Sequence, residues 1–124
     1  MPKIIYLQIR ETALFVQEQG FYIRDVGLLE SAIRRPEASV FGEDAYPDLS
    51  RKAAAMFSSI IRNHPMMDGN KRCSFILTMI FLRINGWTLQ VDEGDMFNFI
   101  VTQAAKQEDL DEIEAFFVKH LVEY

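Results

Sequence analysis

A nine-residue stretch near the middle of this 124-residue chain contains groups that could bind a phosphate chain and take a proton beside it. His64 supplies an imidazole, the side chain that most often takes a proton from an alcohol near neutral pH. Asp68 supplies a carboxylate, and Gly69 permits a tight turn before two adjacent cations. The whole stretch reads His64-Pro65-Met66-Met67-Asp68-Gly69-Asn70-Lys71-Arg72.

The turn at Gly69 and Asn70 leads into an apolar helix, and this junction predicts an anion site. The first N–H groups of a helix have no acceptor inside the helix, and the helix dipole places a partial positive charge beside them. Lys71 and Arg72 oppose that dipole, so a bound anion would relieve an unfavourable arrangement. We therefore predict that Gly69, Asn70, Lys71 and Arg72 bind phosphate. The alternative is that Asn70 only caps the helix and both cations extend into water.

Asp68 is predicted to hold Mg²⁺, because a carboxylate beside phosphates repels them unless a divalent cation lies between. Its alternative role is to shape the loop through an Asx turn. Arg62, two residues before His64, is a further candidate for a phosphate contact on electrostatic grounds alone. Cys73 lies in an apolar run, so it is a weak candidate for a nucleophile and we expect it in the core. His120 lies on an acidic segment, and the chain offers no convincing set of zinc ligands.

Charge and composition narrow the class of protein. The net charge of −5 argues against wholesale nucleic-acid binding, but residues 51–90 carry six cations and one carboxylate. Such local positive charge suits a small anion better than a long polyanion. A hydrophobic share of 49% is typical of a globular protein, and we expect a single domain over residues 1–124. One cysteine, no secretion signal and no apolar tract long enough to span a bilayer favour the cytoplasm.

Apolar periodicity predicts an all-α fold of about six helices, with at most a minor β element. The clearest helix spans Leu49–Asn63, where apolar residues recur at helical spacing. A second one runs from Asn70 to Asn85-Gly86 and is apolar over nearly its whole circumference, so we predict that it is the buried central helix. The other expected elements are an extended start over 3–9, helices ending near Gly20 and Arg35, a loop over 36–47, an extended piece over 87–91, and helices including 96–104 and 110–121. Asp25 is predicted to cap one helix, and Asp109 with Glu112 to form a capping box on another.

The nine-residue stretch closely resembles the signature of the Fic/Doc family, which reads His-Pro-Phe-x-Asp-Gly-Asn-Lys-Arg in its Doc branch. The similarity continues outside the motif and covers most of the chain, with the last thirty or so residues the least distinctive. It extends over residues 24–32, 35–36, 41–47 and 52–54.

This resemblance implies an all-α domain in which the motif joins two central helices, and transfer of a nucleotide-derived group to a protein hydroxyl. It implies that His64 is the general base, that Asp68 binds Mg²⁺, and that the residues from Gly69 to Arg72 hold the phosphates of ATP. Family members that transfer adenylyl groups have glycine at position 71. Lys71 is similar to the Doc branch, so we predict that it favours the reverse nucleotide pose, with the γ-phosphate presented to the hydroxyl.

Doc-type proteins are death-on-curing toxins that phosphorylate elongation factor Tu, and each is restrained by an antitoxin. The resemblance therefore implies a toxin with a Phd-like antitoxin whose C-terminal segment folds on binding. Adenylyl transfer and an inactive binding module are the alternatives. An internal inhibitory Ser/Thr-x-x-x-Glu-Gly segment is not expected, because Leu89 precedes Glu93-Gly94 where the hydroxyl residue is required.

Two positions depart from the family pattern. Met66 stands where the family has the phenylalanine that anchors the loop, and we expect methionine to keep that anchor with looser packing. Cys73 replaces a small residue such as threonine or alanine. The loop from Phe41 to Pro47 is hypothesised to be a lid or a substrate-docking flap, with an ordinary surface loop as the alternative.

Overall fold

The computed structural model describes residues 3–124 and has the all-α architecture that the sequence predicts. In this range there are six α-helices, one short 3₁₀ helix and two small antiparallel strand pairs. The helices are α1 (Ile9–Glu18), α2 (Val26–Arg34), η1 (Arg35–Glu37), α3 (Leu49–Asn63), α4 (Asn70–Ile84), α5 (Glu93–Ala104) and α6 (Leu110–His120). The strands are β1 (Ser39–Val40), β2 (Glu43–Asp44), β3 (Trp87–Leu89) and β4 (Leu121–Glu123).

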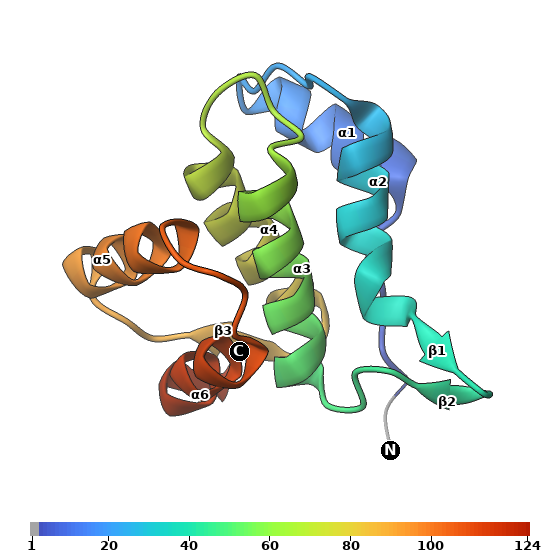
Figure 1. Cartoon of the computed structure of the whole chain (residues 1–124), viewed down its shortest axis with the longest axis vertical. Coiled ribbons are helices and arrows are strands. Elements are labelled where there is room, and N and C mark those ends of the chain that lie inside the picture. Colours follow the sequence, from blue (N-terminus) through green and yellow to red (C-terminus); the bar gives the residue numbers. More distant parts are fainter. Residues whose placement is uncertain (1–2) are drawn as a thin grey trace.

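The antiparallel pair α3 and α4 forms the middle of the molecule, and the motif loop joins the two helices at one end (Figure 1). Helix α2 lies on one side of this pair and α1 crosses near the motif loop, while α5 and α6 lie on the other side (Figure 1). Helix α3 contacts α2, α4, α5 and α6. Within residues 3–124, no helix is both long enough and apolar enough to cross a membrane.

The most buried helix is α3, which corrects the prediction that α4 holds this place. Ten of the fifteen residues of α3 are buried, against six of fifteen in α4. The run Ala53-Ala54-Ala55 lets neighbouring helices approach α3 closely, whereas Phe75 and Ile80 on α4 border open pockets. The apolar pattern identified the helix with the larger side chains rather than the one enclosed by its neighbours.

Aspartates cap several helices as their spacing predicts. The Asp25 side chain accepts a hydrogen bond from the Leu28 N–H at the start of α2, and Asp109 accepts one from the Glu112 N–H at the start of α6. The second half of the expected capping box is absent among the described contacts, because the Glu112 carboxylate instead accepts hydrogen bonds from Gln103 and Lys106.

Strands β1 and β2 form a hairpin in the segment 36–47, which is predicted from the sequence to be a loop. Val40 lies opposite Glu43 in this hairpin. This hairpin lies at the N-terminal end of α3, and the motif loop lies at the C-terminal end (Figure 1). Fifteen helical residues separate these ends, a length of about 22 Å at about 1.5 Å per residue. The hypothesis of a lid over the motif is therefore wrong, because no residue of the hairpin lines the pocket at the motif.

The extended piece expected after α4 is confirmed as β3, and its partner comes from the end of the chain. Strand β4 pairs antiparallel with β3, with Leu89 opposite Leu121. The last helix therefore ends at His120, one residue earlier than its apolar pattern predicts, because Leu121 enters the strand.

Candidate active site

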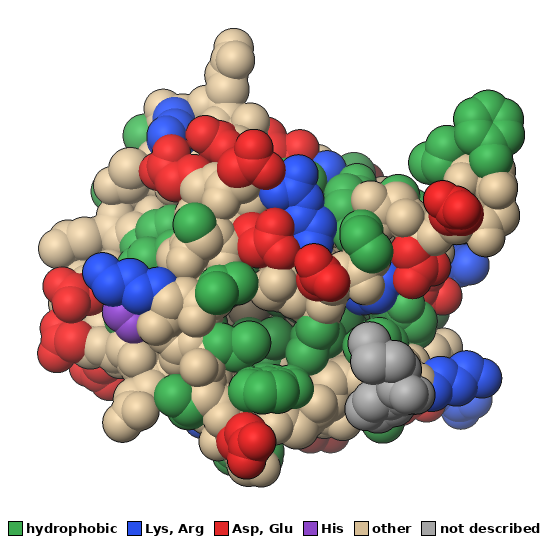
Figure 2. All heavy atoms as spheres, turned by 90° about the horizontal axis from the view of Figure 1, so that it is seen from below, with side chains coloured by type: hydrophobic (Ala, Val, Ile, Leu, Met, Phe, Trp, Pro, Cys, Tyr) green, Lys and Arg blue, Asp and Glu red, His purple; other side chains and the backbone are tan. Residues whose placement is uncertain are grey.

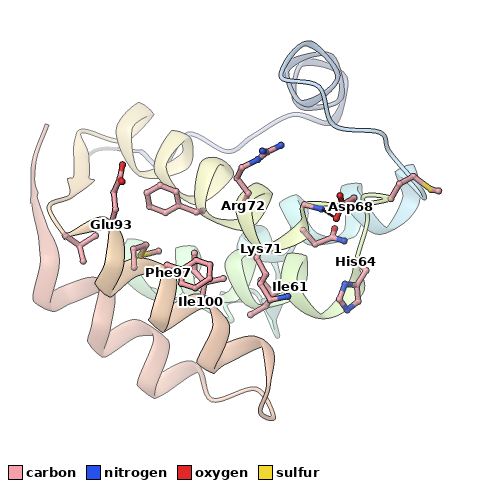
Figure 3. A pocket seen from close by; sticks show the side chains of 14 residues that line it. Ile61, His64, Asp68, Lys71, Arg72, Glu93, Phe97 and Ile100 are labelled. Carbon is pink, nitrogen blue, oxygen red and sulfur yellow. Dashed lines mark hydrogen bonds between the residues drawn. The ribbon is translucent and has the colours of Figure 1, made fainter.

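The motif borders a pocket of about 700 Å³ between the loop, the first turns of α4 and one side of α5 (Figure 3). The loop and α4 contribute the polar groups, and α5 with the end of α3 contributes an apolar wall. The residues lining the pocket are Ile61, His64, Met67, Asp68, Gly69, Asn70, Lys71, Arg72, Phe75, Val91, Glu93, Met96, Phe97 and Ile100. The structure thus brings together every predicted site residue except Arg62.

His64 follows the last residue of α3 and is exposed at the pocket. Its φ of 51° is left-handed, a conformation that costs a non-glycine residue free energy unless its surroundings hold it there. Arg24 supplies this restraint, since its Nε donates to the His64 carbonyl at 2.8 Å and its Nη2 to the Asn63 carbonyl at 2.9 Å. The backbone of His64 is therefore fixed, while its ring makes no hydrogen bond within residues 3–124.

Asn70 organises the motif loop and does not cap α4, which corrects that alternative. Its side chain accepts a hydrogen bond from the Met66 N–H at 2.9 Å and donates to the Met66 carbonyl at 3.1 Å. Met66 is 1% exposed and forms a β-bridge with Ile23. Methionine therefore fills the anchoring position of the loop, as expected for the residue that replaces phenylalanine.

The N-terminus of α4 presents backbone donors to the pocket. Gly69 occupies the N-cap position with a φ of 77°, and the helix has no side-chain cap. The first helical hydrogen bond runs from the Cys73 N–H to the Gly69 carbonyl. Consequently the N–H groups of Asn70, Lys71 and Arg72 have no acceptor in the described part of the chain, which is the arrangement that an anion can satisfy.

Glycine is favoured at position 69 by packing as well as by its positive φ. A Cβ there would lie 3.0 Å from the Phe21 ring, closer than side chains normally approach. The same ring lies 4.6 Å below the Arg72 guanidinium, within the range of a cation–π interaction. Phe21 therefore supports both the turn and one of the two cations.

Lys71 and Arg72 diverge from one another. The Arg72 side chain turns toward α1, and Lys71 extends across the pocket on the side of α5 (Figure 3). Arg72 also borders a second hollow with Tyr22 and Asp68. A phosphate chain lying over the N-terminus of α4 would therefore meet one cation on each side.

The Asp68 carboxylate has one oxygen engaged and one available. Its Oδ1 accepts a hydrogen bond from the Gly69 N–H at 2.8 Å, and the side chain is exposed at the pocket. No group of three or more His, Cys, Asp or Glu residues that could hold a metal exists within residues 3–124. This donor set fits Mg²⁺, which commonly binds one carboxylate and takes its other ligands from phosphates and water.

Arg62 lies outside the pocket, so the structure does not support the predicted phosphate contact. Its guanidinium donates to the Ser58 hydroxyl at 2.9 Å and to the Lys106 carbonyl at 2.8 Å. These bonds tie the last turn of α3 to the end of α5. The prediction failed because charge and sequence proximity to His64 do not determine which face of α3 an arginine occupies.

Cys73 is confirmed as a core residue. It is 1% exposed, and burial raises the pKa of its thiol to about 12. A thiol with that pKa stays protonated near neutral pH and is a poor nucleophile.

Sequence reasoning did not identify several residues that shape the site. Arg24 and Phe21 hold the motif backbone from the segment between α1 and α2, and Phe97, which is 65% exposed, contributes to the apolar wall. Arg24 lies forty residues from His64 in the chain, so no local pattern could relate them. Phe21 and Phe97 are apolar like the core residues, so the sequence pattern does not distinguish them from the core.

Comparison with known proteins shows the family to which the chain belongs. The model of the Fic/DOC family matches residues 3–82, which include the whole motif. The chain is 45% identical over 98 residues to a protein named Toxin Doc from Mycolicibacterium smegmatis, covering 75% of this chain and 73% of that protein. The family match spans more than half of the sequence and the relative is covered over more than two thirds of its length. The chain belongs to the Fic/Doc family and resembles its Doc branch.

Proposed function

We propose that this protein is a Doc-type toxin of a toxin–antitoxin module, which transfers the γ-phosphate of ATP to a hydroxyl of a target protein. The observation that carries the proposal is the convergence on one pocket of His64, Asp68 and the free N–H groups at the start of α4. A base, a metal-binding carboxylate and an anion site are the parts that phosphoryl transfer needs.

In the proposed reaction, the His64 ring accepts the proton of the attacking hydroxyl. The hydroxyl oxygen forms a bond to the γ-phosphorus while the bond from that phosphorus to the bridging oxygen breaks, and ADP leaves. The N–H groups of Asn70, Lys71 and Arg72 bind the phosphate oxygens, and the Lys71 ammonium neutralises charge on the side of α5. Asp68 would hold Mg²⁺, which neutralises phosphate charge when it is bound.

The pose of the nucleotide distinguishes phosphoryl from adenylyl transfer. Lys71 occupies a position at which adenylyl-transferring relatives have glycine, and its side chain fills space beside the α4 N-terminus. We propose that this side chain favours presentation of the γ-phosphate. The apolar wall formed by Met96, Phe97 and Ile100 can cover the remainder of the nucleotide.

The partners follow from the Doc resemblance. The relative from Mycolicibacterium smegmatis is named a toxin. We propose that this chain likewise acts in the cytoplasm on elongation factor Tu, and that a Phd-like antitoxin restrains it through a C-terminal segment that folds on binding.

The proposal is tested by supplying ATP labelled on either the α- or the γ-phosphate to the purified protein with Mg²⁺ and elongation factor Tu. Label from the γ-phosphate on the factor is the expected result. Label from the α-phosphate would establish adenylyl transfer instead. Transfer of neither label, together with unchanged growth of cells expressing the protein, would indicate an inactive binding module.

A further inference from the structure

The β1–β2 hairpin carries an apolar tip that projects from the molecule. Phe41 is fully exposed and Val40 is 57% exposed. Figure 2 shows this tip as a hydrophobic group that stands away from the body on the right-hand side, with an acidic side chain beside it. An aromatic ring in this position contributes nothing to the core.

The backbone at the tip is also costly for phenylalanine. Phe41 has a φ of 52° and Gly42 a φ of 81°, so both residues of this two-residue turn are left-handed. Asparagine followed by glycine is the pair preferred in such turns, and a bulky residue at the first position is strained. Phe41 therefore carries both conformational strain and an exposed ring, and neither helps the chain to fold.

The base of the hairpin, in contrast, is firmly attached. The Lys52 side chain on α3 is 1% exposed, and its Nζ donates to the Asp44 carboxylate at 3.2 Å and to the Pro36 carbonyl at 3.3 Å. The Ala45 N–H closes the hairpin by donating to the Ala38 carbonyl at 2.9 Å. The base of the hairpin is thus held in place, which lowers the entropy lost when a partner binds the tip.

The charge around the tip indicates the chemistry of the partner. Residues 37–48 contain four carboxylates and no lysine or arginine, and Lys52 pairs with one of the four. The complementary surface is an apolar hollow rimmed by lysine or arginine. Aromatic anchors of this kind fill well-packed pockets, and a folded protein already presents such a pocket before binding.

We infer that the hairpin tip docks the folded protein substrate, with Phe41 inserted into a basic-rimmed apolar hollow. This inference rests on the proposed function, and it places a substrate contact outside the reaction pocket. The hairpin lies at the opposite end of α3, so the hollow is remote from the modified hydroxyl (Figure 1). Docking at the tip supplies affinity and specificity that the pocket itself does not.

The test replaces Phe41 with asparagine, the residue that the turn conformation prefers. Transfer of γ-label is measured over a range of elongation factor Tu concentrations, with ATP in excess. We expect Phe41→Asn to raise KM for the protein substrate about tenfold or more. The Kd for ATP is expected to match the wild type, and Tm to equal or exceed it because strain is removed. Val118→Gln is the matched control, since it removes an apolar side chain that is 55% exposed on α6.

The outcomes separate the two proposals. A wild-type KM in Phe41→Asn would overturn the docking inference alone. A fall in its Tm with a weaker affinity for ATP would assign Phe41 a role in folding and would also overturn the inference. The same follows if light scattering shows that the wild type is an oligomer and the variant a monomer, because the tip would then bind a second copy. A wild type that transfers no label overturns the proposed function, and the docking inference with it.

Discussion

Two helix starts in this molecule are built in opposite ways. At the start of α6, the Asp109 side chain accepts a hydrogen bond from the Glu112 N–H, and Asp111 and Glu112 complement the helix dipole. At the start of α4, no side chain of the described residues forms a cap, and Lys71 and Arg72 oppose the dipole. The start of α6 has a side-chain cap and acidic residues that offset its dipole. The start of α4 leaves donors and positive charge for an anion.

The difference between the two helix starts follows from the N-cap residue and from the hydrogen bonds that the Asn70 side chain makes. Asn70 could cap α4, but its side chain is committed to Met66, where it fixes the loop that carries His64 and Asp68. The N-cap position falls on Gly69, which has no side chain to accept a hydrogen bond from the first N–H groups of α4. Hydrogen bonds hold the backbone of the motif loop, whereas the first N–H groups of α4 lack acceptors among the described residues. This combination is expected for a preorganised binding site.

Removing the base beside the start of α4 is expected to lower the transfer rate strongly. Asparagine tolerates the left-handed backbone of His64 but cannot accept the proton, so His64→Asn should lower the transfer rate about 100- to 10,000-fold. Tm should stay near that of the wild type, because the ring is exposed. Transfer of γ-label measures the rate, and retention of most of the activity would remove His64 from the mechanism.

Removing the carboxylate tests the metal contribution. Asp68→Ala should abolish Mg²⁺-dependent transfer while the free energy of unfolding changes little, since within residues 3–124 the Asp68 side chain bonds only to the adjacent Gly69 N–H. Label transfer is measured across a Mg²⁺ titration, and calorimetry gives Tm. A normal Mg²⁺ dependence in the variant would contradict the assignment.

The middle of α4 should behave as ordinary core, in contrast to its first turn. Leu77 is 1% exposed, and Leu77→Ala should lower the free energy of unfolding by about 2–5 kcal/mol through the cavity that it leaves. Urea denaturation measures this loss. A loss under about 1 kcal/mol would mean that α4 is not packed as described.

The cap of α6 should contribute less than the core. Asp109→Ala is expected to lower the free energy of unfolding by about 1 kcal/mol, because the Glu112 N–H loses its acceptor. Asp48→Ala is the matched control, since Asp48 stands at the N-cap position of α3 without a side-chain bond. Equal losses of unfolding free energy in the two variants would show that the hydrogen bond from the Glu112 N–H to Asp109 does not stabilise the protein measurably.

The smallest expected effect is a change in the stability of the ligand-free protein, and its sign tests the comparison of the two helix starts. Lys71→Gln should stabilise the ligand-free protein by about 0.3–1 kcal/mol, because it removes a cation facing the dipole of α4. The same variant should show a smaller rise in Tm when ATP and Mg²⁺ are added. Calorimetry with and without nucleotide measures both effects. A destabilised ligand-free variant would contradict the view that α4 begins in an unfavourable arrangement.

Local patterns were sufficient to predict much of this fold. The bounds Leu49–Asn63 follow from helical spacing and from the His64-Pro65 stop, and Asp25 and Asp109 cap as their positions predict. The motif residues also converge as expected, because they lie on one short loop and the helix turn that follows it.

The features that were not predicted depend on contacts between distant parts of the chain. Arg62 turns toward the end of α5, and Arg24 reaches the His64 carbonyl from the segment before α2. Strand β4 pairs with β3 across thirty or more residues, and no pattern in either strand identifies its partner. Burial of α3 depends on how many helices surround it, which its own sequence does not encode.

The central claim is that the α4 N-terminus holds the phosphates of ATP, and amide NMR tests it directly. Resonances of the Asn70, Lys71 and Arg72 N–H groups are followed while ATP and Mg²⁺ are added to ¹⁵N-labelled protein. We predict that these three amides shift most strongly, while those of Leu110 and Asp111 at the capped start of α6 stay in place. Saturable shifts elsewhere with unmoved α4 amides, or no shift at millimolar ATP, would contradict the account.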